Sequence, residues 1–147
     1  MNDQDRATCA ALAGLLRAAG LLAWWGFALM CIAALVLALT LRSLSTLPTM
    51  GFGAVVVLGL LERYFAFRLR LDEALFDGLA RNTVASLQAL DQALSALGLR
   101  DAPATPHAVR PLDERLLGTR QLMQRHSLVV ACQSAFFLLA LLTQDMS

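Results

Sequence analysis

The sequence predicts an all-α integral membrane protein with three transmembrane helices and a cytoplasmic antiparallel helical hairpin. Three observations favour this fold class. Three long apolar runs lack the two-residue alternation of strands, the arginines are unevenly distributed between the segments that join these runs, and leucines recur at helical spacing in the longest joining segment. Because only helices and closed barrels satisfy the backbone in lipid, such runs predict helices.

The composition also indicates a membrane protein. The 147 residues are 58% hydrophobic and only 16% charged, with a mean hydropathy of +0.61, whereas a soluble domain usually carries about 25% charged residues. All twelve basic residues are Arg, and Ala and Leu are abundant, which favours a GC-rich bacterial source. The net charge of +1 gives no sign of a nucleic-acid-binding surface.

The first span is predicted at residues 19–41. The stretch between Arg17 and Arg42 contains no charged residue, and a hydrocarbon core of about 30 Å requires about 20 apolar residues in a helix. The run is longer than the apolar region of a signal peptide, which has about 7–15 residues, so we expect it to be retained. The preceding segment, 1–17, is expected to continue directly into this span.

Two further spans follow. A short polar turn after Arg42 ends near Pro48, a residue that suits the first turn of a helix because that position needs no N–H. The second span is predicted at residues 48–67. The third begins at Ser127 and, with a length of 17 residues, is near the lower limit for crossing a bilayer.

Residues 68–126 are predicted to form the helical hairpin, with helices at 68–97 and 111–126 and a turn that contains Pro103 and Pro106. The lack of a strong helix breaker allows the first helix to continue the second span, and the second helix to continue into the third. The first helix is longer than its partner, so part of its leucine stripe should stay free to dock a protein partner or a second copy. The stripe consists of Leu71, Leu75, Leu79, Leu87, Leu90, Leu94 and Leu97.

The chain therefore divides into three expected parts. Residues 1–67 hold the N-terminal segment and a transmembrane hairpin, residues 68–126 form the cytoplasmic hairpin, and residues 127–147 form the third span and an outer C-terminus. Neither half of the chain repeats the other.

The arginines predict the orientation. Nine of the twelve lie between Arg63 and Arg125, two precede the first span, and only Arg42 lies on the opposite side. The positive-inside rule therefore places the N-terminus and residues 68–126 in the cytoplasm of a bacterial inner membrane. The residues expected to anchor the chain at the membrane interfaces are Arg17, Trp24, Trp25, Arg42, Tyr64 and Arg125.

Three polar residues are expected inside the membrane: Glu62, Arg63 and Gln133. A carboxylate in hydrocarbon is costly and usually faces the interior of a helix bundle. The similar depths of Glu62 and Gln133 predict a contact between them, with Arg63 or Arg17 as alternative partners. Glu62 is thus a candidate for a proton or ion relay or for an anchor of a partner's arginine. The alternative is a Glu–Arg pair that marks the membrane edge.

No catalytic or metal-binding pattern is visible. The three cysteines are too few and too far apart for a zinc site. His107 and His126 lack neighbours at ligand spacing, so both are expected at solvated or interfacial positions. Adjacent acids at 72–73 and 113–114 do not share a helix face and are expected on solvated faces. We expect no enzyme activity, no cofactor and no small-molecule substrate.

The sequence favours a non-catalytic accessory or scaffold subunit of the inner membrane, whose partners are membrane lipid and either another protein or its own copies. Two alternatives stay open. One is a subunit of a proton- or ion-coupled transporter that uses Glu62, because that carboxylate lies within an apolar run. The other is a small pore-forming protein of the holin or toxin kind, since such proteins are also short and helical.

Overall fold

The structure is a computed structural model that describes residues 3–40, 44–83, 95–96 and 112–144. Within these ranges the chain forms three long helices and no strand. Each helix is long and apolar enough to cross a membrane, so the prediction of an all-helical chain with three such helices is confirmed. The helices are α1 (Asp3–Thr40), α2 (Thr46–Ala80) and α4 (Leu112–Gln144).

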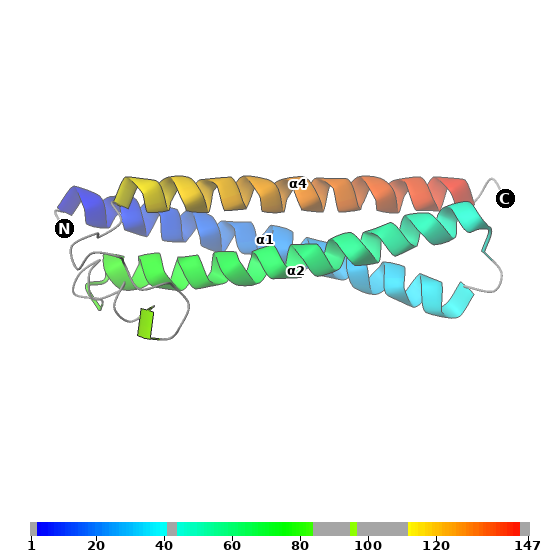
Figure 1. Cartoon of the computed structure of the whole chain (residues 1–147), viewed down its shortest axis with the longest axis horizontal. Helices are drawn as coiled ribbons and strands as arrows, with labels where there is room; N and C mark the ends of the chain where they lie inside the picture. The colour runs from blue at the N-terminus through cyan, green and yellow to red at the C-terminus, as the bar shows by residue number, and fades with distance from the viewer. Residues whose placement is uncertain (1–2, 41–43, 84–94, 97–111, 145–147) are drawn as a thin grey trace.

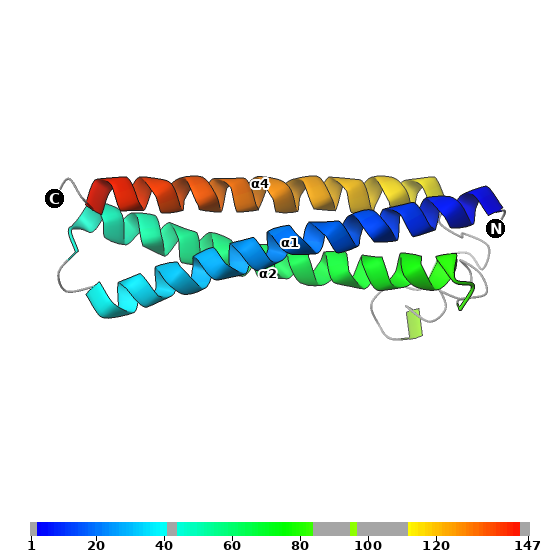
Figure 2. The same ribbon diagram turned by 180° about the vertical axis from the view of Figure 1, so that it is seen from behind.

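The three helices lie side by side as one elongated bundle (Figures 1 and 2). Helix α2 runs antiparallel to α1 and α4, so the start of α1, the end of α2 and the start of α4 meet at the same end of the bundle. Both views show α1 crossing α2 and diverging from α4 toward Thr40. This topology follows from the short α1–α2 connection, which permits only antiparallel neighbours.

The buried positions recur in alternating steps of three and four residues, the spacing of a helix-bundle seam. Polar side chains such as Glu62 and Gln133 lie inside the bundle because they occupy buried positions of this repeat. On α2 the seam is formed by Pro48, Phe52, Val55, Gly59, Glu62, Ala66 and Leu69. On α4 it includes His126, Val130, Gln133 and Ala140.

The seam contains two apolar clusters with polar residues between them. The first cluster, near the start of α1, joins Leu12 and Leu16 to Phe76 and Leu79 of α2, with partly buried leucines of α4 packed against it. The second joins α1, α2 and α4 near the opposite end and includes Phe52, whose ring meets that of Phe137 edge to face. The first half of α1 thus belongs to the same core as residues 68–80, a contact that the sequence analysis did not anticipate.

Each helix is longer than the hydrocarbon core of a bilayer. At 1.5 Å per residue α1 is about 57 Å long and α4 about 50 Å, against a core of about 30 Å. Apart from Glu62 and Arg63, every charged side chain of the three helices lies at one end of the bundle. We call this end, which consists of residues 3–17, 68–80 and 112–125, the stalk. It extends about 20 Å beyond the apolar part of the bundle.

Helix α2 continues past the predicted second span without a break but ends at Ala80. The prediction of one uninterrupted helix over residues 68–97 is therefore wrong. Asn82 adopts a left-handed conformation with a φ of 59°, its N–H bonds to the Leu79 carbonyl, and the Thr83 N–H bonds to the Gly78 carbonyl. These bonds form a Schellman motif, which terminates a helix, and Asn is one of the residues that tolerate its left-handed position.

Several predicted features lie outside the described residues. Of the predicted hairpin, residues 84–94 and 97–111 are not described, and the described pair 95–96 is helical. The predicted turn with Pro103 and Pro106 falls in the second of these ranges. Four members of the leucine stripe also fall outside the described residues: Leu87, Leu90, Leu94 and Leu97.

Close packing in the apolar part depends on glycines. A Cβ built on Gly51 would lie 2.8 Å from Cβ of Ala140, and one built on Gly59 would lie 2.7 Å from Cβ of Met30. A Cβ on Gly53 would meet nothing within 4 Å. Small residues let membrane helices approach one another closely, so Gly51 and Gly59 mark the contacts of α2 with α4 and α1.

We predict that Gly51→Ala destabilises the bundle while Gly53→Ala does not. The new methyl at position 51 would clash with the Ala140 methyl, and such overpacking costs about 1–3 kcal/mol. At position 53 the space is open, and alanine is the better helix former by about 1 kcal/mol. The measurement is the midpoint of SDS-induced unfolding of the detergent-solubilised protein, followed by circular dichroism. Equal midpoints for the two variants would contradict the α2–α4 packing.

Candidate functional site: a buried polar node between the three helices

A group of polar residues lies between the two apolar clusters of the seam. It consists of Glu62 and Arg63 on α2, His126 and Gln133 on α4, and the backbone of Gly26 on α1. We call this group the polar node. Glu62 and Gln133 are 0% exposed and His126 is 1% exposed, so the node is enclosed by the bundle itself.

Glu62 is the centre of the node because both of its carboxylate oxygens accept hydrogen bonds. Its Oε1 accepts from Nε2 of His126 at 2.9 Å and from Nη2 of Arg63 at 2.9 Å, and its Oε2 accepts from Nε of Arg63 at 2.7 Å. An ionised carboxylate is an acceptor only, so His126 carries a hydrogen on Nε2 in this arrangement. The fork of Arg63 neutralises the carboxylate through two parallel bonds, the strongest type of ion-pair geometry.

Arg63 also connects α2 to α1. Its Nη2 donates a hydrogen bond to the carbonyl oxygen of Ala23, and its guanidinium carbon lies 5.0 Å from the centre of the Phe27 ring. The ring face attracts the cation. The charge of Arg63 is thus shared among a carboxylate, a backbone carbonyl and an aromatic face.

Gln133 connects α4 to both other helices. Its Nε2 donates to the Gly26 carbonyl at 2.9 Å and is 3.4 Å from the Val55 carbonyl. A Cβ built on Gly26 would lie 3.0 Å from Cγ of Glu62 and 3.1 Å from Oε1 of Gln133. Glycine at position 26 therefore leaves the space that these two side chains fill.

Two atoms of the node make no hydrogen bond with any described residue. They are Nδ1 of His126 and Oε1 of Gln133, both with almost no exposed surface. Buried polar atoms are normally paired, and each exception calls for an explanation.

At the edge of the node a further contact joins α1 to α4, because Nε1 of Trp25 donates to Oγ of Ser134 at 3.1 Å.

The structure shows which groups surround Glu62. The carboxylate faces the bundle interior, as the cost of a charge in hydrocarbon predicts. Between Glu62 and Gln133 there is no hydrogen bond; both side chains lie beside Gly26. Of the alternative partners, Arg63 forms the ion pair, and Arg17 pairs with Glu73 at 3.0 Å.

His126 is a correction to the sequence analysis. It was expected at a solvated or interfacial position, but it is buried and bonded to Glu62. Its place in the seam is four residues before Val130 and seven before Gln133, and this spacing was the signal that could have identified it. The apolar runs did not reveal it because His126 lies just before the third run begins.

The expectation of solvated acids holds for only one pair. Asp113 and Glu114 are exposed in the first turn of α4. Asp72 accepts a hydrogen bond from Oγ1 of Thr119 at 2.9 Å, and Glu73 pairs with Arg17. Asp72 and Glu73 therefore join α2 to α4 and to α1 within the stalk instead of facing only solvent.

The remaining predicted residues are divided between surface and core. The side chains of Trp24, Trp25, Tyr64, Arg17 and Arg125 are exposed, as interface anchors should be, and Arg42 lies outside the described residues. In the described part of the leucine stripe, Leu71 is exposed, Leu75 packs against the first apolar cluster and Leu79 is buried within it. Leu79 is therefore not available to a docking partner in this fold.

The chemistry of the node is that of a charge-balanced hydrogen-bond network. Among the described residues, no three His, Cys, Asp or Glu side chains gather as metal ligands do. The network can fix the relative positions of the helices, and His126 can pass its Nε2 proton to Glu62 when its Nδ1 takes up a proton in exchange.

Comparisons of this chain with protein-family models, with curated proteins and with solved structures found no match.

We predict that Glu62→Ala destabilises the bundle by about 3 kcal/mol, the low end of the cost of leaving a buried charge unpaired. The low end applies because the Arg63 side chain is 36% exposed and can turn toward the surface. Glu62→Gln should cost less, since an amide still offers an oxygen acceptor to Arg63 or His126. The matched control is Asp113→Ala on the exposed first turn of α4. SDS unfolding midpoints that agree for Glu62→Ala and Asp113→Ala would show that the node does not hold the bundle.

Proposed function

We propose that this chain is a non-catalytic accessory or scaffold subunit of a bacterial inner membrane. The three apolar helix segments cross the bilayer, the stalk and the N-terminus lie in the cytoplasm, and the C-terminus lies outside. The charge distribution supports this orientation: Arg6, Arg17 and most other arginines of the described helices lie in the stalk, and basic residues remain on the cytoplasmic side.

The observation that carries the proposal is that one packed bundle continues from the apolar part into the stalk. The first apolar cluster fills the stalk interior, and ion pairs of Arg17 with Glu73 and Asp77, at 3.0 and 3.6 Å, join α1 to α2 around it. The Thr119–Asp72 hydrogen bond joins α4 to α2. A stalk of about 20 Å that is built in this way holds a fixed position above the membrane surface, which is what a scaffold requires.

The stalk also presents apolar side chains to its surroundings. Leu15 on α1 and Leu117 on α4 are exposed although they lie among charged residues. These side chains replace the covered leucines Leu75 and Leu79 as the candidates for docking. A helix of a partner protein, or of a second copy of this chain, can cover them by side-to-side packing.

A photo-crosslinking amino acid at position 117, in cells that express the protein at its native level, tests this proposal. We expect a discrete crosslinked species that contains either a second copy of the chain or one defined cytoplasmic protein. The matched control is position 138, because Leu138 is 60% exposed and Leu117 is 57% exposed, but Leu138 lies in the apolar part of the bundle. The readout is gel mobility followed by mass spectrometry of the adduct.

Three outcomes would count against the proposal. Adducts of equal yield at positions 117 and 138 would show that the stalk is not the preferred contact. An exported protein bound at position 117 would contradict the orientation. A monodisperse monomer in mild detergent, without adducts at position 15 or 117, would contradict the scaffold function itself.

A second candidate function, a proton-coupled subunit, is favoured by one specific observation. Glu62 and His126 are titratable, are buried, and lie 2.9 Å apart, and Nδ1 of His126 has no partner among the described residues. A buried ionisable pair of this kind is a common element of proton relays in membranes. No comparable observation on the described helices favours the pore-forming alternative.

The second candidate predicts that proteoliposomes take up protons when a pH gradient is imposed. Glu62→Gln should reduce the rate at least tenfold, because the amide cannot exchange the carboxyl proton, while Asp113→Asn should leave the rate unchanged. The measurement is the fluorescence of a pH-sensitive dye trapped in the vesicles. A wild-type rate equal to that of protein-free vesicles would exclude this function.

A further inference from the structure

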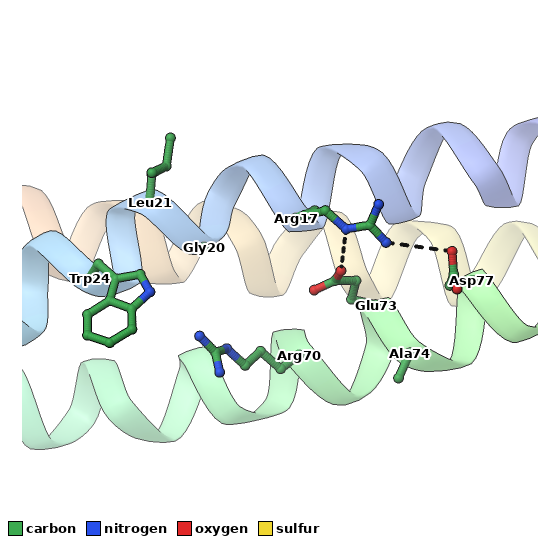
Figure 3. A pocket seen from close by; sticks show the side chains of 8 residues that line it. All are labelled: Arg17, Gly20, Leu21, Trp24, Arg70, Glu73, Ala74 and Asp77. Carbon is green, nitrogen blue, oxygen red and sulfur yellow. Dashed lines mark hydrogen bonds and ion pairs between the residues drawn. The ribbon is translucent and has the colours of Figure 1, made fainter.

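A groove of about 520 Å³ opens between α1 and α2 where the apolar part of the bundle meets the stalk. Its walls carry three kinds of side chain (Figure 3). Leu21 and Trp24 are apolar, Arg17 and Arg70 are cations, and the carboxylates come from Glu73 and Asp77. A groove of this volume is within the range of small-molecule sites, about 300–1,000 Å³.

The position of the groove along the bundle corresponds to the headgroup layer of a bilayer. At 1.5 Å per residue, Arg17 lies about 35 Å from Thr40 along α1, and Arg70 lies about 35 Å from Leu47 along α2. The hydrocarbon core is about 30 Å thick. Both arginines are therefore just beyond its inner edge, at the depth of lipid phosphates.

The groups that line the groove follow a fixed order along the bundle. The exposed side chains of Leu21 and Trp24 are nearest the apolar part. Arg70 comes next, and Glu73 and Asp77 follow it by one and two helical turns in the direction of the stalk. From the membrane outward, the order is thus the apolar side chains, then Arg70, and then the two carboxylates with Arg17 bonded to both of them.

The two arginines of the groove differ in their partners. Arg17 is held by Glu73 at 3.0 Å and by Asp77 at 3.6 Å. Arg70 is exposed and, among the described residues, has no hydrogen bond or ion pair, and its guanidinium extends along the groove on the side of Trp24 (Figure 3). Arg70 is therefore a free cation beside an aromatic ring at the level of lipid phosphates.

We propose that this groove binds one phospholipid whose headgroup carries both a phosphate and a primary ammonium. The phosphate accepts hydrogen bonds from Arg70, and the ammonium donates to Oε2 of Glu73, a partly exposed side chain whose other oxygen accepts from Arg17. The upper part of the acyl chains lies against Leu21 and Trp24. The sequence of groups in such a lipid, from chain to phosphate to ammonium, matches the sequence of groups in the groove.

One carboxylate oxygen of the groove favours a lipid with an ammonium over an anionic lipid. Asp77 is already paired with Arg17 at 3.6 Å and with Arg81 at 2.9 Å, whereas only Oε1 of Glu73 is bonded, to Arg17 at 3.0 Å. An anionic headgroup that lacks an ammonium would leave Oε2 of Glu73 without a donor. A choline headgroup has a positive charge but no N–H, so it cannot form the hydrogen bond that this oxygen accepts.

Native mass spectrometry of the full chain in detergent tests the proposal, with three lipids of identical acyl chains as probes. We expect phosphatidylethanolamine to bind at least five times more tightly than phosphatidylcholine or phosphatidylglycerol. The soluble headgroup glycerophosphoethanolamine should bind at least ten times more weakly than the intact lipid, because it lacks the contacts with Leu21 and Trp24.

Two arginine variants identify the site. Arg70→Gln should weaken the binding of phosphatidylethanolamine about tenfold. Arg68→Gln is the matched control, because Arg68 is also exposed, lies two residues away on α2 and does not line the groove. Arg70 has no ion pair or hydrogen bond among the described residues, whereas Arg68 acts on Asp72 through its charge, so SDS unfolding midpoints check that both variants remain folded.

A third variant tests the carboxylate of Glu73. Glu73→Gln should remove the preference for phosphatidylethanolamine over phosphatidylglycerol while the variant still binds lipid through Arg70.

Binding of phosphatidylglycerol by the wild type as tightly as phosphatidylethanolamine would overturn the assignment of an ammonium site. Equal losses for Arg68→Gln and Arg70→Gln would show that the lipid responds to charge alone and would overturn the site. Tight binding of the soluble headgroup would overturn the role of the acyl chains.

Discussion

The burial of one carboxylate in the apolar part of the bundle constrains how the three helices can pack. Glu62 is fully enclosed, and an ionised carboxylate in such surroundings persists only when it is paired and hydrogen-bonded. Its partners come from its own helix and from α4, while Arg63 and Gln133 extend the network to backbone carbonyls of α1. The three helices must therefore keep one depth relative to one another, since a shift by a single turn would separate His126 of α4 from Glu62 and the Ala23 carbonyl of α1 from Arg63. Apolar side chains alone specify such a depth weakly, because one leucine layer resembles the next.

The seam of buried positions is continuous, so the relative arrangement of the three helices extends from the apolar part into the stalk. The steps of three and four residues that place Glu62 and Gln133 inside the bundle also place Leu69 and Phe76 of α2 inside the stalk. Lipid does not drive apolar helices together, whereas water does. The apolar part thus depends on glycine contacts and the polar node, and the stalk depends on hydrophobic burial and ion pairs. The same spacing of buried residues suits both lipid and water, because it determines only which side of each helix faces the other helices.

The three long apolar helices were predictable because each contains a long apolar run, and the cost of exposing the backbone in lipid leaves few alternatives to a helix. Glu62 was recognisable as unusual because it interrupts such a run. The role of His126 was not recognised, because a histidine at the end of an apolar run resembles an interfacial residue unless its spacing from Val130 and Gln133 is followed. The end of α2 was missed because Asn82 stops the helix by adopting a left-handed conformation, which many asparagines do not do. The contact of the first half of α1 with α2 is tertiary, and no local pattern in residues 3–17 specifies it.

Three arginines of the described helices differ both in depth and in their partners. Arg63, the only one within the apolar part of the described helices, is neutralised by Glu62 and bonded to the Ala23 carbonyl. Arg17, at the membrane edge, is shared between Glu73 and Asp77 but stays exposed. Arg70, at the same depth on the opposite wall of the groove, has no partner among the described residues. A cation in hydrocarbon must carry its counter-charge with it, whereas a cation at the headgroup layer can take that charge from lipid. The same residue type therefore has a structural role inside the bundle and, in the proposed lipid site, a binding role at its edge, and what distinguishes the two is the solvent that each depth would provide.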